Sequence, residues 1–196
     1  MVICVAGPIA AGKNFYCSQL QEQGYFCLDA DAEIHKIIQE KQKEIFAQFE
    51  EAAARAGLCL RAVDGSLDRR ALGRLLFRRP EFLERQERIV YPEFEARVQK
   101  LIDSENSRGL VINAALLYKT PKILRQCKKI IYVDAPLLVR VWRSRRRDKL
   151  SFLQILRRIK SQRGLYDQYK KFAADNGIEI VRVRNWGRGV CAPSSL

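Results

Sequence analysis

The stretch Gly7–Asn14, which directly follows the apolar run Val2–Ala6, constrains the fold of this chain more than any other feature. It has the pattern G-x-x-x-x-G-K. The two glycines let successive backbone N–H groups curl around phosphate oxygens, and Lys13 neutralises phosphate charge. A helical pattern follows the loop and ends near Gly24. A strand, a phosphate loop and a helix in this order predict a nucleotide site; the alternative is an ordinary glycine-containing turn between a strand and a helix.

The residue after this lysine is unusual. Asn14 stands where a Ser or Thr normally offers its hydroxyl to Mg²⁺. An amide oxygen can also bind a hard cation, although it lies one atom further from the backbone. Asn14 is therefore a candidate metal ligand, and the use of Mg²⁺ is a property to test.

Short apolar segments, rich in β-branched residues, alternate with helical patterns along the chain. Strands of this kind predict an α/β fold with a five-stranded parallel sheet that helices cover on both faces. The segments predicted to be strands are Val2–Ala6, Tyr25–Leu28, Leu110–Asn113, Lys129–Val133 and Ile178–Val183.

The interval between the second and third predicted strands is too long for one crossover helix. Residues 34–105 are therefore predicted to form a helical insertion, with a turn at Asp64–Ser66, a helix cap at Asp68 and breaks at Pro80 and Pro92. Residues 138–164 form a second, smaller insertion. The core then comprises residues 1–33, 106–137 and 165–196. This organisation suits a small-molecule phosphotransferase, in which one insertion holds the acceptor and the other is a lid that excludes water from ATP.

Composition narrows the class of protein further. In the 196 residues, no window approaches the ~18 consecutive apolar residues of a membrane span, and no signal peptide is recognisable, so we expect a cytoplasmic protein with no membrane partner. The six cysteines form no C-x-x-C pair, which argues against zinc and disulfides and favours core positions. A single histidine, His35, excludes multi-histidine sites.

The net charge of +14 favours an anionic partner, which can be a nucleotide or a nucleic acid. Cationic residues concentrate between Arg140 and Arg163. A run of this kind also fits a solvated helix face, so the charge does not choose between these partners.

The sequence Asp29-Ala30-Asp31 ends the second predicted strand. In extended geometry the two carboxylates point to the same side, and ligands of parallel sheets bind beyond the carboxyl ends of the strands. One carboxylate could then orient or deprotonate an acceptor hydroxyl, while the other holds Mg²⁺ directly or through water. The alternative is that one of them only caps the next helix.

Together these motifs resemble the dephospho-CoA kinase family over most of the chain. Gly7–Asn14 and Asp29–Asp31 match its phosphate loop and its D-A-D sequence, and Asp64–Leu72 matches D-G-x-L-D-R-x-A-L, with Phe77 and Pro80 at the expected spacing. The remaining matches are to P-L-L and to the lid patterns R-x-x-x-R and R-I-x-x-Q: Leu116, Leu117, Arg143, Arg147, Arg158, Ile159 and Gln162.

The resemblance implies a P-loop NTPase fold and transfer of the ATP γ-phosphate, with Mg²⁺, to the ribose 3′-hydroxyl of dephospho-CoA. It implies that Lys13, Asp31 and Arg143 are catalytic, with Asp31 as the base or hydroxyl orienter, and that Asp29 supports the acceptor or the metal. The implied ATP-binding residues are Gly7, Ala10, Ala11, Gly12, Lys13, Asn14, Phe15, Arg143 and Arg147. The implied acceptor-binding residues are Asp29, Asp31, His35 and Leu116.

The chain also departs from the family pattern. Tyr91-Pro92 replaces His-Pro, and Lys119 replaces the glutamate of P-L-L-x-E. The family's ending, close to A-D-x-V-I-D-N, is stretched here into residues 174–178 and a strand that ends near Arg184-Asn185. Two alternatives therefore stay open: a kinase of the same fold with another small hydroxyl or nucleotide acceptor, and a catalytically weak protein that binds nucleotide or nucleic acid. The sequence does not specify an oligomeric state.

Overall fold

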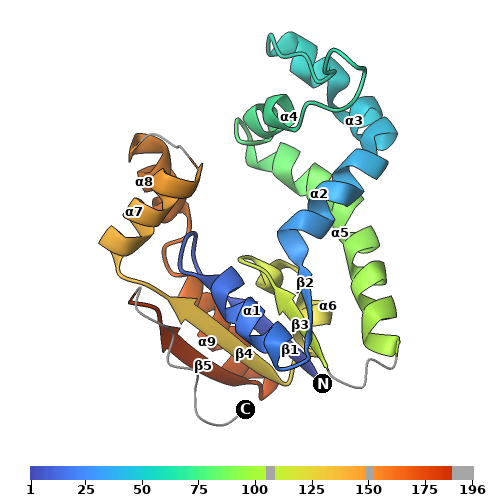
Figure 1. Cartoon of the computed structure of the whole chain (residues 1–196). Coiled ribbons are helices and arrows are strands. Elements are labelled where there is room, and N and C mark those ends of the chain that lie inside the picture. The colour runs from blue at the N-terminus through green and yellow to red at the C-terminus, as the bar shows by residue number, and fades with distance from the viewer. Residues whose placement is uncertain (105–108, 149–151, 187–196) are drawn as a thin grey trace. The chain divides into compact units, whose positions relative to one another are not determined.

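Five parallel strands form one sheet in the computed structural model, which describes residues 1–104, 109–148 and 152–186, without the side chains of residues 147, 148 and 153. The strands run in the order β2-β3-β1-β4-β5 (Figure 1). Each agrees with its predicted range to within one residue at either end. The strands are β1 (Val2–Ala6), β2 (Phe26–Asp29), β3 (Leu110–Asn113), β4 (Lys129–Asp134) and β5 (Glu179–Arg184).

The register of the sheet brings three chain segments to one edge. Val5 of β1 and Asp29 of β2 both lie opposite Asn113, the last residue of β3. The phosphate loop begins directly after β1. The carboxyl ends of β2 and β3 therefore lie beside the loop, where parallel sheets bind their ligands.

Helices cover both faces of the central strand. Ile3 and Val5 pack in a buried cluster with Tyr16 and Leu20 of α1 (Lys13–Glu22). Figure 1 shows α1 in front of the sheet and α9 (Leu165–Asn176) behind it. This two-sided cover explains why every residue of β1 is buried.

Tyr169 holds α9 to the segment after β3. Its hydroxyl donates to the Ala115 carbonyl at 3.2 Å and accepts from the Leu117 N–H at 2.8 Å. Its ring meets that of Tyr118 edge to face, with centroids 5.8 Å apart. Burial raises the pKa of Tyr169 well above its ordinary value, so the hydroxyl keeps the proton that it donates.

The chain divides into two compact units, residues 1–30 with 101–196, and residues 31–100. The first unit also holds η1 (Leu117–Lys119), α6 (Pro121–Leu124), α7 (Leu137–Asp148) and α8 (Phe152–Ser161). The helices of the other segment are α2 (Ala30–Glu40), α3 (Gln42–Arg55), α4 (Arg69–Leu76) and α5 (Pro80–Asp103). Within the described ranges, no helix combines the length and apolar character needed to cross a bilayer.

Two local predictions for the second unit are confirmed. Asp68 caps α4, since its carboxylate accepts from the backbone N–H groups of Arg70 at 2.8 Å and Ala71 at 3.1 Å. Asp64 closes the preceding turn by accepting from both the N–H and the hydroxyl of Ser66.

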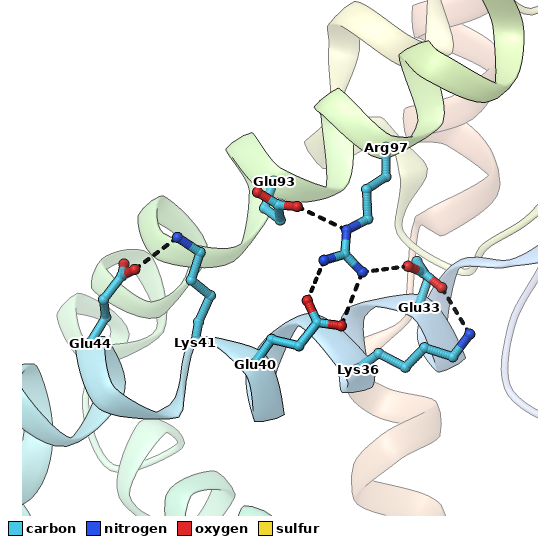
Figure 2. A network of polar contacts seen from close by, with 7 residues as sticks. All are labelled: Glu33, Lys36, Glu40, Lys41, Glu44, Glu93 and Arg97. Atoms are coloured by element: carbon cyan, nitrogen blue, oxygen red, sulfur yellow. Dashed lines mark hydrogen bonds and ion pairs between the residues drawn. The ribbon is translucent and has the colours of Figure 1, made fainter. Parts of the chain in front are cut away.

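An ionic cluster around Arg97 joins α5 to α2 (Figure 2). Arg97 donates to Glu33 of α2 and to Glu93 of its own helix, at 2.9 Å each, and also to Glu40 near the end of α2. The hydrogen bond from Arg97 is the main reason why the pKa of Glu33 lies below its ordinary value.

The predicted break at Pro92 is wrong, because α5 continues through this residue. Pro80 is the first residue of α5, where a missing N–H leaves no helical bond unmade. Pro92 does remove one such bond. However, the buried residues Val90, Phe94 and Val98 continue the same apolar stripe on both sides of it, and this packing keeps the segment helical.

Candidate active site

The two glycines of the phosphate loop occupy positions that disfavour any residue with a side chain. Both have positive φ, 146° at Gly7 and 103° at Gly12. A Cβ atom on Gly7 would lie 2.1 Å from the Val133 carbonyl oxygen, and one on Gly12 would lie 2.1 Å from Nδ2 of Asn185. Ala10 also has positive φ, at 58°. Alternating backbone conformations of this kind turn successive N–H groups toward one anion site.

Lys13 is the first residue of α1 and bonds back onto the loop. Its ammonium donates to the Gly7 carbonyl at 2.9 Å and to the Pro8 carbonyl at 3.4 Å. The N-terminus of α1 adds its own positive potential at the same place. Loop, lysine and helix together form an anion-binding site.

The segment predicted to be a lid contacts the backbone of this loop. At Ile9, the N–H donates to the Gln162 side chain at 2.7 Å, and the carbonyl accepts from Arg140 at 3.0 Å. Arg143 of α7 donates to the carbonyls of Ala10 at 3.3 Å and Ala11 at 3.2 Å. These bonds fix α7 beside the phosphate loop.

Asn185, which follows β5, completes this arrangement. It accepts from Arg143 at 3.0 Å and donates to the Ala11 carbonyl at 3.1 Å. Asn185 and Arg140 are not among the site residues predicted from the sequence. One sequence feature could have identified Asn185: it is a polar residue just after a predicted parallel strand, at the sheet edge where the phosphate loop lies.

A cavity of about 460 Å³ lies between the loop and α7. Three cations line it: Lys13, Arg143 and Arg146. Trp142, Ala10, Gly12 and Asn14 complete the lining. The size is typical of a small-molecule site, and the charge suits a polyphosphate.

Asn14 and Asn113 form a pair at the edge of this site. Nδ2 of Asn113 donates to Oδ1 of Asn14 at 2.9 Å, while the buried Oδ1 of Asn113 has no hydrogen-bond partner. Asp29 lies opposite Asn113 in the sheet. Amide and carboxylate oxygens are the ligand types that Mg²⁺ takes. Among the described residues, no group of three or more His, Cys, Asp or Glu side chains could hold a metal.

The sequence predicts that the two carboxylates of D-A-D point to the same side of one strand. This prediction is wrong, because the two residues lie in different elements. Strand β2 ends at Asp29, while Ala30 begins α2 and Asp31 lies in its first turn. Both side chains are exposed. The alternation of side chains along an extended strand therefore does not apply to this pair.

The other predicted site residues are dispersed. His35 is exposed on α2, Leu116 is exposed before η1, and Phe15 is 49% exposed on α1. Ala11 is fully buried and contributes its carbonyl to Arg143. The side chain of Arg147 lies outside the described residues.

Comparisons with known sequences point to one enzyme family. A family model described as dephospho-CoA kinase matches residues 1–179. A dephospho-CoA kinase of Treponema pallidum is 36% identical over 194 residues, which cover 95% of this chain and 88% of that protein. One from Treponema denticola is 32% identical over 179 residues, covering 89% and 79%.

Solved structures share the fold. The crystal structure of TT1252 from Thermus thermophilus superimposes with a TM-score of 0.78 at 28% identity, covering 96% of this chain and 90% of that one. A dephospho-CoA kinase from Campylobacter jejuni has a TM-score of 0.58 at 23% identity and covers 95% and 88%, which concerns the fold alone. The family model and the two treponemal relatives show that this chain belongs to the dephospho-CoA kinase family.

Proposed function

We propose that this chain transfers the γ-phosphoryl group of ATP to the ribose 3′-hydroxyl of dephospho-CoA, giving CoA and ADP. The main structural support for this proposal is that Lys13 of the phosphate loop and Arg143 of α7 line one cavity. Membership of the dephospho-CoA kinase family supports this choice of acceptor.

In this proposal the loop and the lid provide charge neutralisation. Phosphoryl transfer asks little covalent chemistry of a protein, so catalysis depends on position and on compensation of phosphate charge. The N–H groups from Gly7 to Asn14 and the Lys13 ammonium hold the phosphates. Arg143 is already fixed by its bonds to Ala10, Ala11 and Asn185, so it needs little reorganisation to meet them.

Residues 138–164 act as the lid, and residues 34–105 hold the acceptor. The contacts of Gln162, Arg140 and Arg143 with the loop support the first assignment, because the loop that they contact is the one that would bind the phosphates. A lid in this position keeps water from competing with the acceptor hydroxyl.

The residues at the sheet edge fit a magnesium ion. Asn14 and Asp29 would hold it directly or through water, since Mg²⁺ is usually bound by one or two protein oxygens together with phosphates and water. The buried, unpaired Oδ1 of Asn113 adds a third hard oxygen nearby. When bound, the ion neutralises charge on the transferring phosphate.

Asp31 accepts or orients the proton of the acceptor hydroxyl, and Asp29, His35 and Leu116 contact the acceptor. The D-A-D motif supports these roles. Asp31 lies in the first turn of α2, and the oxygens of its carboxylate can accept a hydrogen bond from a hydroxyl.

A coupled assay of ADP release tests the proposal. Dephospho-CoA should be turned over, while its 3′-deoxy analogue and a panel of nucleosides and nucleotides should not, and Lys13→Met should abolish the rate. No turnover of dephospho-CoA at millimolar concentration would overturn the proposal. Turnover of a different member of the panel would identify a kinase with another acceptor.

A further inference from the structure

Trp142 places an aromatic surface in the cavity beside the phosphate loop. Its side chain is 60% exposed, and it lines the cavity together with Lys13 and Arg143. We propose that Trp142 and Arg146 form a platform on which the adenine base of a substrate nucleotide stacks. This inference rests on the proposed function, because it assigns a part of the substrate to the same cavity.

Trp142 lies in the part of α7 that is bonded to the phosphate loop. It directly precedes Arg143, which bonds to the loop carbonyls of Ala10 and Ala11. Arg146 lies four residues after Trp142, on the same face of the helix, and its guanidinium carbon is 5.4 Å from the centre of the indole ring. A platform on a helix that is tied to the phosphate loop keeps a constant distance from bound phosphates.

The chemistry of the pair favours a planar base. Cations in the cavity can bind phosphate, but an indole ring offers phosphate no charge, so a purely anionic ligand would leave Trp142 exposed to water. A nucleobase, in contrast, presents a flat π surface that stacks on tryptophan and on the guanidinium of arginine. The cavity of about 460 Å³ is of the size that binds small molecules.

The second tryptophan of the chain provides a matched control. Trp186 is 65% exposed, much like Trp142, but it borders a different hollow with Asp134, Ala135, Pro136, Arg182 and Arg184. No phosphate-loop residue lines that hollow among the described residues. The two tryptophans therefore have similar exposure. They differ in that Trp142 lines a cavity together with phosphate-loop residues and Trp186 does not.

Both substrates of the proposed reaction carry adenine, so the test must separate them. In a Trp186→Phe variant, Trp142 is the one remaining tryptophan of the chain and reports ligands by its fluorescence. ATP is compared with tripolyphosphate, and dephospho-CoA with 4′-phosphopantetheine, because the second ligand of each pair lacks the base. Quenching by ATP but not tripolyphosphate assigns the platform to the donor; quenching by dephospho-CoA but not phosphopantetheine assigns it to the acceptor. Equal signals within both pairs, or none, would overturn the proposal.

Kinetics give an independent readout. Trp142→Ala should raise KM for the assigned substrate roughly 5- to 150-fold, the range for loss of one stacked base, with a smaller change in kcat. Trp142→Phe should restore most of the affinity, while Trp186→Ala should leave both KM values unchanged. If Trp142→Ala leaves both KM values unchanged, the platform does not exist. The fluorescence experiment needs no turnover, so its result stands even if dephospho-CoA is not the acceptor.

Discussion

The side-chain amide of Asn113, at the end of β3, donates a hydrogen bond of 2.9 Å to Oδ1 of Asn14, at the start of α1. The acceptor in this bond is the atom that Asn14 would offer to a metal ion. Asn113 is buried while Asn14 is exposed, so the hydrogen bond between them is shielded from water on one side only. An oxygen held in this way has less freedom to approach a cation than a serine hydroxyl at the same position.

The first prediction concerns Mg²⁺. Asn14→Ser should lower the Mg²⁺ concentration for half-maximal rate by roughly tenfold. The hydroxyl is the usual ligand, and the substitution removes the Asn14 oxygen that accepts the hydrogen bond from Asn113. The measurement is initial rate against free Mg²⁺ at saturating ATP. Asn14→Ala, which offers no oxygen, should shift the curve in the opposite direction. An unchanged curve for Asn14→Ser would contradict an impaired metal site: it would mean that Asn14 replaces the hydroxyl adequately, or that carboxylates and water hold the ion. An unchanged curve for Asn14→Ala as well would select the second of these.

Asp31→Asn should separate chemistry from binding. Removal of a base usually lowers kcat by about 10²- to 10⁴-fold, while ATP affinity depends on the loop and should stay within about twofold. Single-turnover rates and equilibrium ATP binding measure the two effects. Asp175→Asn, at an exposed position of α9, is the control and should have normal activity. Near-normal activity of Asp31→Asn would remove this residue as the base.

Gln162→Leu should loosen the lid from the phosphate loop. The substitution leaves the Ile9 N–H without its partner, a loss of about 1–2 kcal/mol, so kcat/KM for ATP should fall roughly 5- to 30-fold. ATP hydrolysis without acceptor should rise relative to transfer, since water gains access. Gln168→Leu, exposed on α9, serves as the control. An unaltered ratio of hydrolysis to transfer would contradict a role of this bond in excluding water.

Two glycine substitutions should have opposite effects on stability. Gly7→Ala places a Cβ against the Val133 carbonyl at positive φ and should lower the free energy of unfolding by at least about 2 kcal/mol. Gly73→Ala lies within α4 with nothing within 4 Å of the new atom, and should raise this free energy by about 0.5–1 kcal/mol. Urea unfolding measures both. If Gly7→Ala were as stable as the parent and bound ATP normally, the close approach of the loop to β4 would be wrong.

Acid should weaken the Arg97 cluster. The hydrogen bond from Arg97 lowers the pKa of Glu33 in the folded state below its ordinary value of 4.5, so the stabilisation is present above that value and is lost as the pH falls through the folded pKa. The free energy of unfolding should therefore decline below about pH 5.

Arg97→Ala should make this decline shallower, because Glu33 then keeps only its pair with Lys36 and its pKa in the folded chain moves toward the unfolded value. Arg55→Ala, which removes an exposed pair with Glu51 on α3, should leave the decline unchanged. Urea unfolding between pH 3 and pH 7 makes the comparison. Identical pH profiles for Arg97→Ala and the parent would show that the cluster does not stabilise the fold.

The elements built by local rules could be predicted from the sequence. Apolar, β-branched segments predicted all five strands. In β1 and β3, burial on both faces leaves no polar alternation. The cap at Asp68 and the turn at Asp64 also follow from residue types that satisfy nearby backbone groups. The phosphate loop could be located as well, because the spacing of its glycines and lysine is itself a local pattern.

Features that depend on contacts between distant segments could not be predicted in this way. Helix α5 continues through Pro92 because its apolar stripe is buried, and helix α2 begins directly after Asp29. Asn113 and Asn185 reach the loop from the ends of β3 and β5, at separations of 99 and 174 residues from their partners. Only the order of strands in the sheet brings such residues together.

The link between lid and loop has a consequence for how this protein can vary. Gln162 and Arg140 bind the N–H and the carbonyl of Ile9, and Arg143 binds further loop carbonyls, so every one of these bonds is to main-chain atoms. The side chain at position 9 takes no part in them. A substitution at Ile9 that leaves the backbone conformation unchanged should therefore preserve the hydrogen bonds between the lid and the phosphate loop. Ile9 is for this reason a suitable place for a spectroscopic label.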